Sequence, residues 1–229
     1  MRASESCSLF GVVLLAFLLE PAGLRAADTN GVIEAWLAAQ TNFTTWTAEF
    51  VQTRWLKALN QPLVSTGQVW FARPNRFRWE LGVPAQTIAV RDDQLLQVIY
   101  PRLKRVEHYP LDAAQSSPMS EALGLLDAGF PRNRADFDAR FWVRSIEPLD
   151  QAWQIELEPS SASARRVMPT LRVVLAATDF SLLATEMQFP DGSRMRSDYR
   201  SAAFNRDFSM DLFRPGIPPD FLISKPLAP

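Results

Sequence analysis

The residues that could perform chemistry are few in this chain of 229 residues. His108 is the only histidine and Cys7 is the only cysteine. A Ser–His–acid triad would have to use His108 as its base. No Gly-x-Ser-x-Gly motif is present, and strand alternation places Glu107 and Tyr109 on the face opposite His108. One histidine also cannot supply the usual ligands of a zinc site. We therefore expect no catalytic residue, no metal and no cofactor, and the protein is predicted not to be an enzyme.

Paired carboxylates and basic runs are the next candidates for chemistry. Asp92-Asp93 is predicted to be a turn, and Glu156 with Glu158 the polar face of a strand, so neither is expected to act as an acid–base pair. The basic groups at residues 102–105 and 132–134 are short, and the net charge of −1 gives no bulk attraction to nucleic acid or anionic lipid. Both runs are predicted to be solvated, and no nucleic-acid partner is expected.

The N-terminal region has the pattern of a secretory signal peptide. Arg2 precedes an apolar run at residues 9–19, and Ala26-Ala27 offers small residues for cleavage. The run is shorter than the roughly 20 residues that span a bilayer, which favours a cleaved signal over the alternative, an uncleaved anchor. Cys7 would leave with the signal, so the mature chain would hold no disulfide. We expect residues 1–26 to be the signal peptide and residues 27–229 to form a single domain.

Residues 65–81 are the stretch around which the rest of the chain is organised. Two runs alternate apolar and polar residues, which places one set on each face of a pleated strand. The apolar face carries Val69, Phe71, Phe77, Trp79 and Leu81. Between the runs, Arg73-Pro74-Asn75 is typical of a tight turn. The predicted hairpin has one aromatic face, which something must cover, and one charged face.

The remaining pattern predicts ten or eleven short antiparallel strands and two short helices. Helices are expected at residues 29–40 and 118–127, each with one apolar stripe, and residues 160–164 are predicted to be a flexible loop. Strands beside the hairpin are expected at residues 46–59, 86–91, 94–100, 103–109, 141–146, 153–158, 171–176, 182–189 and 194–200, with a last edge strand at 219–223. No βαβ rhythm appears. The fold class is therefore α+β: mainly antiparallel β, an incomplete, half-open β-barrel with the helices in its mouth.

Three stretches resemble the periplasmic lipoprotein carrier family, LolA. The first is Phe50-Val51-Gln52-Thr53 followed by GQVWFARPNRFRW at residues 67–79, the second is YPRLKRV at 100–106 with Pro-Leu-Asp at 110–112, and the third is Phe213 with the prolines of 215–219. The resemblance implies that the short helices form a lid over a cavity for acyl chains, and that the protein is a periplasmic monomer. The chain departs from the family pattern at residues 57–65 and 160–164.

The resemblance also implies a function. The protein would take acylated lipoproteins from an inner-membrane ABC release complex and pass them to an outer-membrane acceptor. The alternative is a related lipid- or glycolipid-binding protein, or a sensor of stray lipoproteins, on the same fold. The notion of an exported hydrolase is disfavoured because the nucleophile and base are missing.

The resemblance assigns a role to two residues. Arg73 would hold the lid by bonding helix carbonyls, and Phe77 would tune how tightly lipid is kept; a plain turn residue and a core aromatic are the alternatives. The predicted lining of the cavity is Trp46, Phe50, Val69, Phe71, Phe77 and Trp79. Because Pro74 and Asn75 are expected to set the turn, Arg73→Leu is predicted to leave the fold intact and to impair transfer.

Overall fold

The computed structural model describes residues 29–92, 94–111 and 128–225. The described strands are β1 (Thr45–Trp55), β2 (Leu63–Ala72), β3 (Arg76–Leu81), β4 (Thr87–Arg91), β5 (Leu95–Tyr100), β6 (Arg105–Pro110), β7 (Phe141–Leu149), β8 (Ala152–Pro159), β9 (Thr170–Ala176), β10 (Leu182–Gln188), β11 (Arg194–Phe204) and β12 (Leu222–Ser224). The described helices are α1 (Thr29–Gln40), α3 (Arg134–Arg140) and α4 (Ala162–Val167), with 3-10 turns η1 (Pro101–Leu103) and η2 (Met210–Phe213).

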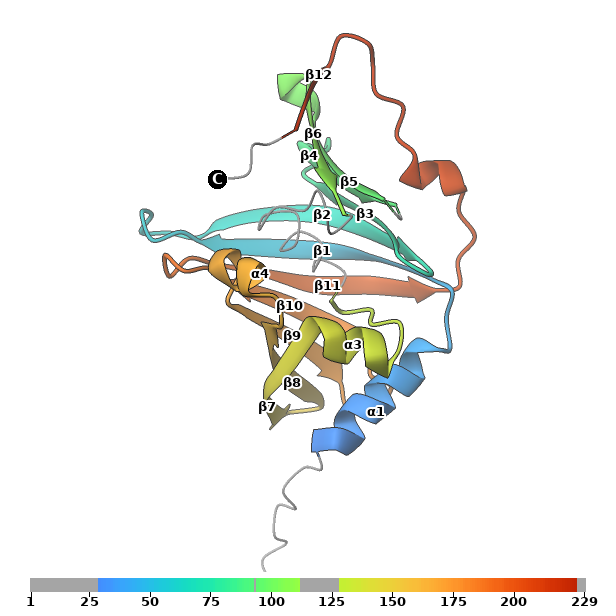
Figure 1. Ribbon diagram of the computed structural model, residues 1–229, viewed down its shortest axis with the longest axis vertical. Coiled ribbons are helices and arrows are strands. Elements are labelled where there is room, and N and C mark those ends of the chain that lie inside the picture. Colours follow the sequence, from blue (N-terminus) through green and yellow to red (C-terminus); the bar gives the residue numbers. More distant parts are fainter. Residues whose placement is uncertain (1–28, 93, 112–127, 226–229) are drawn as a thin grey trace, which may run out of the picture.

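All these strands belong to one sheet in the order β12-β6-β5-β4-β3-β2-β1-β11-β10-β9-β8-β7. Strands β1 to β6 form one meander of antiparallel neighbours and β7 to β11 form another, and the pairing of β1 with β11 joins them. The end strands β12 and β7 do not pair with each other, so the sheet is curved but not closed (Figure 1). The predicted fold class, a mainly antiparallel half-open barrel with short helices, is confirmed.

The central hairpin forms as predicted. Strands β2 and β3 pair across the turn, with Phe71 opposite Phe77 and Val69 opposite Trp79. The faces alternate as expected, since Phe71 and Phe77 are buried while Arg76 and Arg78 are half-exposed on the other side. The Arg73–Pro74 peptide bond in the turn is cis.

Several predicted strands have different ends in the structure: β7 runs on to Leu149 and β11 to Phe204, where ends at residues 146 and 200 were expected. Strand β1 stops at Trp55 rather than at residue 59, because Leu59 N–H bonds the Leu56 carbonyl at 2.9 Å and closes a turn. Strand β6 begins at Arg105 rather than at residue 103, because η1 occupies residues 101–103 and Lys104 takes a left-handed conformation at φ 47°.

The helices differ more from the prediction. Helix α1 forms at residues 29–40 as expected, whereas the predicted helix at 118–127 and the predicted signal peptide lie outside the described residues. Helix α3 was not predicted, and α4 replaces most of the loop predicted at 160–164. Both are short and are started by a side-chain cap: Asn133 Oδ1 accepts from Asp136 N–H at 2.9 Å, and Ser161 Oγ accepts from Ala164 N–H at 3.4 Å.

The last strand is the one described strand that does not run antiparallel to its neighbour, and it covers residues 222–224 where an edge strand at 219–223 was expected. Strand β12 lies at the edge but pairs with β6 in parallel, with Leu222 opposite Arg105 and Ser224 opposite Glu107. The connection of residues 205–221, which includes η2, runs along one side of the sheet and returns the chain to the same end at which β6 starts (Figure 1). A long crossing connection of this kind makes the parallel direction available.

The apolar core lies on the concave side of the sheet. Trp36 of α1, Phe137 of α3 and Trp46 of β1 belong to one buried cluster, and the rings of Trp36 and Phe137 meet edge to face with centroids 5.7 Å apart. The convex side carries ion pairs, such as Arg172 bonded to Glu156 at 2.9 Å and to Glu186 at 3.0 Å, and a smaller apolar cluster in which Phe213 packs on Ala72 and Val90. The helices therefore cover part of the face that the strand pattern required to be covered.

Candidate functional site

Arg73 ties the central hairpin to the end of α1. Its Nε donates to the Phe43 carbonyl at 2.9 Å, and its Nη2 donates to the carbonyl of Gln40, the last residue of α1. The backbone N–H of Arg73 also donates to the Thr44 carbonyl at 2.9 Å. The last carbonyls of a helix have no partner within the helix, so one side chain from the β2–β3 turn satisfies a backbone group that α1 leaves free.

The charge of Arg73 is balanced by backbone dipoles. Burial lowers the pKa of the Arg73 guanidinium from its ordinary value, but arginine remains charged at neutral pH. No ion pair joins Arg73 to a carboxylate among the described residues. Its partners are carbonyl oxygens at the negative end of the α1 dipole and the ring of Phe43, whose centroid lies 5.5 Å away. A contact of this kind can hold α1 without fixing it through a buried ion pair.

An aromatic stack lies beside this contact. Phe130 lies parallel to Phe71 with centroids 4.5 Å apart, and its ring is 4.7 Å from Trp46 and 6.0 Å from Phe43. Phe130 was missed by the sequence reasoning, because it lies in an irregular segment where no periodicity marks it. The segment before α3 thus supplies a ring that covers the mouth end of β1 and β2.

A second aromatic pair lies further along the same face. Phe50 and Trp79 stack with centroids 5.2 Å apart at an interplanar angle of 9°. Gly67 makes room for this pair, since a Cβ there would lie 2.2 Å from both Phe50 Cζ and the Glu80 carbonyl oxygen. Tyr199 of β11 meets Phe50 at 6.3 Å, and desolvation raises the pKa of its phenol to about 12.

The structure brings the predicted lining residues together. All lie on the concave side in the same apolar cluster as α1: Trp46, Phe50, Val69, Phe71 and Phe77 are buried, and Trp79 is half-buried. The indole Nε1 of Trp46 is buried without a hydrogen-bond partner among the described residues. Contact of these side chains with a ligand stays a prediction.

A small apolar pocket opens next to Arg73. It has a volume of about 190 Å³ and lies between the end of α1, Phe130 and the β9–β10 turn. Its apolar walls are Phe43, Phe130, Phe180, Leu182 and Phe204. Gln40 also lines it; its side chain is 3% exposed, and its Oε1 has no partner within the described part of the chain. The pocket can accept an apolar chain, and Asn42, Asp179 and Ser181 add polar groups to its wall.

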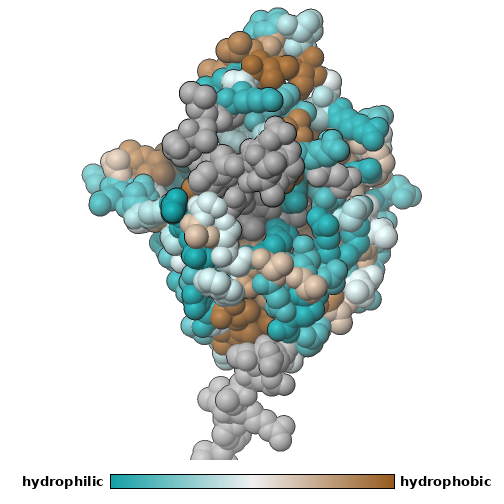
Figure 2. Space-filling view, in the orientation of Figure 1, coloured by the Kyte–Doolittle hydropathy of each residue, from teal (hydrophilic) through white to brown (hydrophobic). Residues whose placement is uncertain are grey.

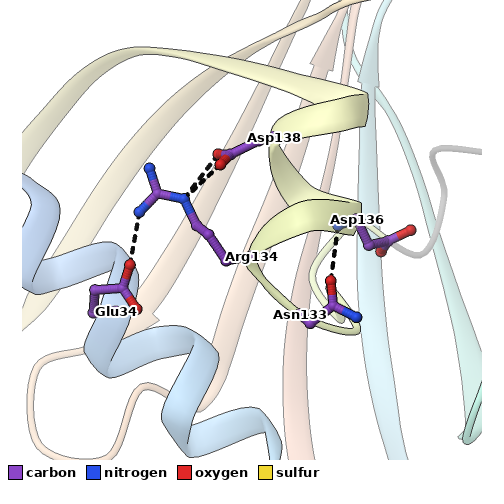
Figure 3. A network of polar contacts seen from close by, with 5 residues as sticks. All are labelled: Glu34, Asn133, Arg134, Asp136 and Asp138. Carbon is purple, nitrogen blue, oxygen red and sulfur yellow. Dashed lines mark hydrogen bonds and ion pairs between the residues drawn. The ribbon is translucent and has the colours of Figure 1, made fainter.

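A polar network joins α1 to α3 (Figure 3). Arg134 donates from Nε to both oxygens of Asp138, at 2.9 and 2.8 Å, and from Nη1 to Glu34 Oε1 at 2.8 Å, while Asn133 caps α3. The hydrogen bonds that Arg134 donates to Asp138 and Glu34 raise the pKa of its guanidinium. These groups are exposed, and such pairs stabilise little. Their effect is to hold α1 and α3, the helices that carry Trp36 and Phe137, in a fixed relative position.

The other chemical candidates have structural roles. Asp92 accepts from the N–H groups of Gln94 and Leu95, each at 2.9 Å, and so shapes its turn. His108 sits on β6 with Nε2 buried, and burial followed by the charge of Lys225 lowers the pKa of its imidazole. In the described ranges no group of three His, Cys, Asp or Glu could hold a metal, and no helix there is long and apolar enough to cross a membrane.

Comparison with known proteins supplies a family match. The family model described as "Outer membrane lipoprotein carrier protein LolA" matches residues 41–215. No curated protein gives a significant match.

Similar solved structures are found at low sequence identity. An uncharacterized conserved protein from Thermus thermophilus is 9% identical, covers 86% of this chain and 98% of its own, and has a TM-score of 0.50. A putative outer membrane lipoprotein-sorting protein domain from Vibrio parahaemolyticus is 10% identical over 80% of this chain and 95% of its own, with a TM-score of 0.49. A LolA superfamily protein from Nitrosomonas europaea is 12% identical over 80% and 96%, with a TM-score of 0.44.

Proposed function

The chain belongs to the LolA family of outer membrane lipoprotein carrier proteins, and from this membership we propose that it binds the acyl chains of lipoproteins in the periplasm and carries them from the inner to the outer membrane. Its partners would be an inner-membrane ABC release complex and an outer-membrane acceptor. Residues 1–26 would direct export and be removed, and residues 27–229 would act as one domain and as a monomer.

The observation that carries the proposal is the bond between Arg73 and the end of α1. The arginine lies in the turn between β2 and β3, which carry Phe71, Phe77 and Trp79 on the covered face, and it bonds the carbonyls of Gln40 and Phe43. Releasing two or three hydrogen bonds of this kind changes a conformational equilibrium by a few kcal/mol. Opening at this point would let an acyl chain reach the face now covered by α1 and Phe130.

The aromatic face suits an acyl chain. A methylene removed from water contributes about 0.8 kcal/mol and needs no hydrogen bond. Phe77 lies in the same buried cluster as Phe71 and Trp46 and is 4% exposed. A charged side chain at this position would therefore weaken the binding of an apolar ligand. We propose that Arg73 controls access and that Phe77, with Trp46, Phe50, Val69, Phe71 and Trp79, contacts the lipid.

Two measurements test the carrier function. The first is mass spectrometry of lipids and proteins that co-purify with the exported protein; acylated lipoproteins are expected. The second is displacement of a fluorescent fatty-acyl probe, for which micromolar, exchangeable binding is expected, weakened in Phe77→Glu. Binding that does not exchange would favour the alternative of a sensor or glycolipid carrier, and no binding at all would exclude a lipid cargo.

A matched pair of arginine variants tests the lid. Arg73→Leu should impair transfer of a labelled lipoprotein to outer membranes. Arg76→Leu, at the first residue of β3 and on the convex face, should transfer like the wild type. Equal transfer by both variants would exclude the role of Arg73.

A further inference from the structure

The hairpin that joins β1 to β2 projects from the sheet and ends in exposed apolar side chains. Leu59 and Leu63 are each 46% exposed and Val64 is 62% exposed. Residues 57–64 are all exposed. Figure 1 shows this hairpin reaching beyond the neighbouring strands, and Figure 2 shows apolar surface at the same projecting end. Water therefore surrounds the leucines on several sides, unlike side chains in a groove.

The base of the projection carries positive charge and an aromatic ring. Arg54, Lys57 and Arg194 are exposed, and the Arg194 guanidinium lies 4.0 Å from the centroid of the half-buried Trp55 ring. No ion pair joins these three residues to a carboxylate within the described ranges. The nearby carboxylate of Asp191 accepts from the N–H and Oγ–H of Ser193, each at 2.8 Å. These hydrogen bonds lower the pKa of Asp191, and the charge of Lys57 also helps to lower it, so this carboxylate offsets part of the positive charge, while Arg54 and Arg194 add to that charge.

This order of residues matches the layers of a bilayer surface. Leucine and valine at a tip favour the acyl boundary, tryptophan favours the headgroup level, and lysine and arginine favour anionic phosphate. A convex tip suits a soft lipid surface better than a protein partner, which would have to provide a cleft for it. Because the whole chain is close to neutral, the attraction must come from this local cluster.

We propose that the β1–β2 hairpin tip, residues 54–64, is a membrane-docking element that inserts Leu59, Leu63 and Val64 into the surface of a bilayer containing anionic phospholipid. The docking is distinct from cargo binding. The tip lies at the end of β1 and β2 opposite to Arg73 and Phe130. A docked protein therefore keeps its α1 end away from the point of insertion.

Vesicle sedimentation of the purified, exported protein tests this proposal. Vesicles of phosphatidylethanolamine with phosphatidylglycerol should bind the wild type, and the double variant Leu59→Asp with Val64→Asp should bind about tenfold more weakly. Leu149→Asp is the matched control, because Leu149 lies beside the β7–β8 turn and is also 46% exposed. The control should bind like the wild type, and melting curves should show that all variants are folded.

A charge variant distinguishes docking on anionic lipid from nonspecific adsorption through exposed apolar side chains. Lys57→Gln, which removes one positive charge, should weaken binding to the anionic vesicles about fivefold and leave any binding to pure phosphatidylcholine unchanged. Failure of the wild type to sediment, equal binding by the double variant, or an equal loss in Leu149→Asp would overturn the proposal. So would a wild-type dimer that the double variant dissociates, since the tip would then contact a second copy. None of these results depends on which lipid co-purifies.

Discussion

The two ends of the β1–β2 pair are built from similar residues and have opposite fates. At one end, Trp46 and Phe71 are each 1% exposed, and α1, Phe130 and Arg73 lie around them. At the other end, Leu63 and Val64 are 46% and 62% exposed. Apolar type alone therefore does not decide burial in this fold; what decides it is whether another part of the chain reaches that end of the strands.

The covered end also has side-chain hydrogen bonds to α1 that have no counterpart at the projecting end within the described residues. Arg73 bonds carbonyls of Gln40 and Phe43 and so attaches α1 at a defined place. The projecting end has a turn closed by one backbone bond, from Leu59 N–H to the Leu56 carbonyl. One end is suited to opening and closing over a ligand, and the other to contact with something outside the molecule.

The largest effect is expected for Trp36→Ala, which removes the side chain that anchors α1 over the covered end. Trp36 is 0% exposed and packs against Phe137, and losing a buried aromatic costs about 3–5 kcal/mol. Denaturant titration followed by circular dichroism measures the loss. Leu183→Ala, at a side chain that is 38% exposed, is the control and should change the free energy of unfolding little. A small loss in Trp36→Ala would mean that α1 is not anchored through this ring.

Gly67→Ala tests the middle of the pair, between the two ends. The new methyl group would meet Phe50 Cζ and the Glu80 carbonyl oxygen at 2.2 Å, and overpacking of this kind costs about 1–3 kcal/mol. Gly216→Ala, where a Cβ would meet nothing within 4 Å, should melt like the wild type. If both variants melt together, the Phe50–Trp79 stack can move aside freely, and the middle of the face is softer than its packing indicates.

Arg73→Leu should have an effect on stability no larger than that of Gly67→Ala, and one that is confined to α1. The sequence-based expectation was a fold left intact; the structure adds the loss of side-chain bonds to two carbonyls, which costs about 1–3 kcal/mol when a carbonyl is left unsatisfied. Hydrogen exchange should become faster in α1 and stay unchanged in β8 and β9. The exchange rate of α1 in Arg73→Lys should lie between those of the wild type and Arg73→Leu, because lysine keeps the charge but lacks the planar guanidinium. Uniformly faster exchange would show that Arg73 supports the whole sheet instead.

The smallest effect is expected at the projecting end. Leu59→Asp should change the free energy of unfolding by less than about 0.5 kcal/mol, the range of ordinary surface substitutions, because the side chain already faces water. Thermal melting in buffer without lipid measures this. A clear destabilisation would mean that the tip packs on the body, and the contrast between the two ends would fail.

Alternation made the strands and their faces predictable. The pattern at residues 65–81 sufficed to place Phe71 and Phe77 on the covered side and Arg76 on the other, because a pleated strand has a fixed period of two. The apolar stripe of α1 was equally plain. The resemblance to the carrier family predicts a role for Arg73, whose side chain bonds the carbonyls of Gln40 and Phe43 in the structure.

The features that were missed depend on single residues or on distant parts of the chain. Helices α3 and α4 are too short to show a period and start at one capping side chain each, Asn133 and Ser161. Phe130 covers the stack from an irregular segment, and its position depends on tertiary contacts with Phe71 and Trp46. The parallel pairing of β12 depends on the path of residues 205–221, which local sequence does not encode.

The seam between β1 and β11 has a consequence for how the chain folds. Within each meander, neighbouring strands follow one another closely in sequence, so their loops close quickly, whereas the seam pairs Trp46 with Phe204 and Trp55 with Arg194. Pairing of such distant segments is slow because the whole intervening chain must be ordered first. If the chain emerges from a membrane N-terminus first, β1 presents an unpaired edge until β11 arrives. We expect seam closure to limit the folding rate, and this interval to be the one in which the newly exported chain is most prone to aggregate.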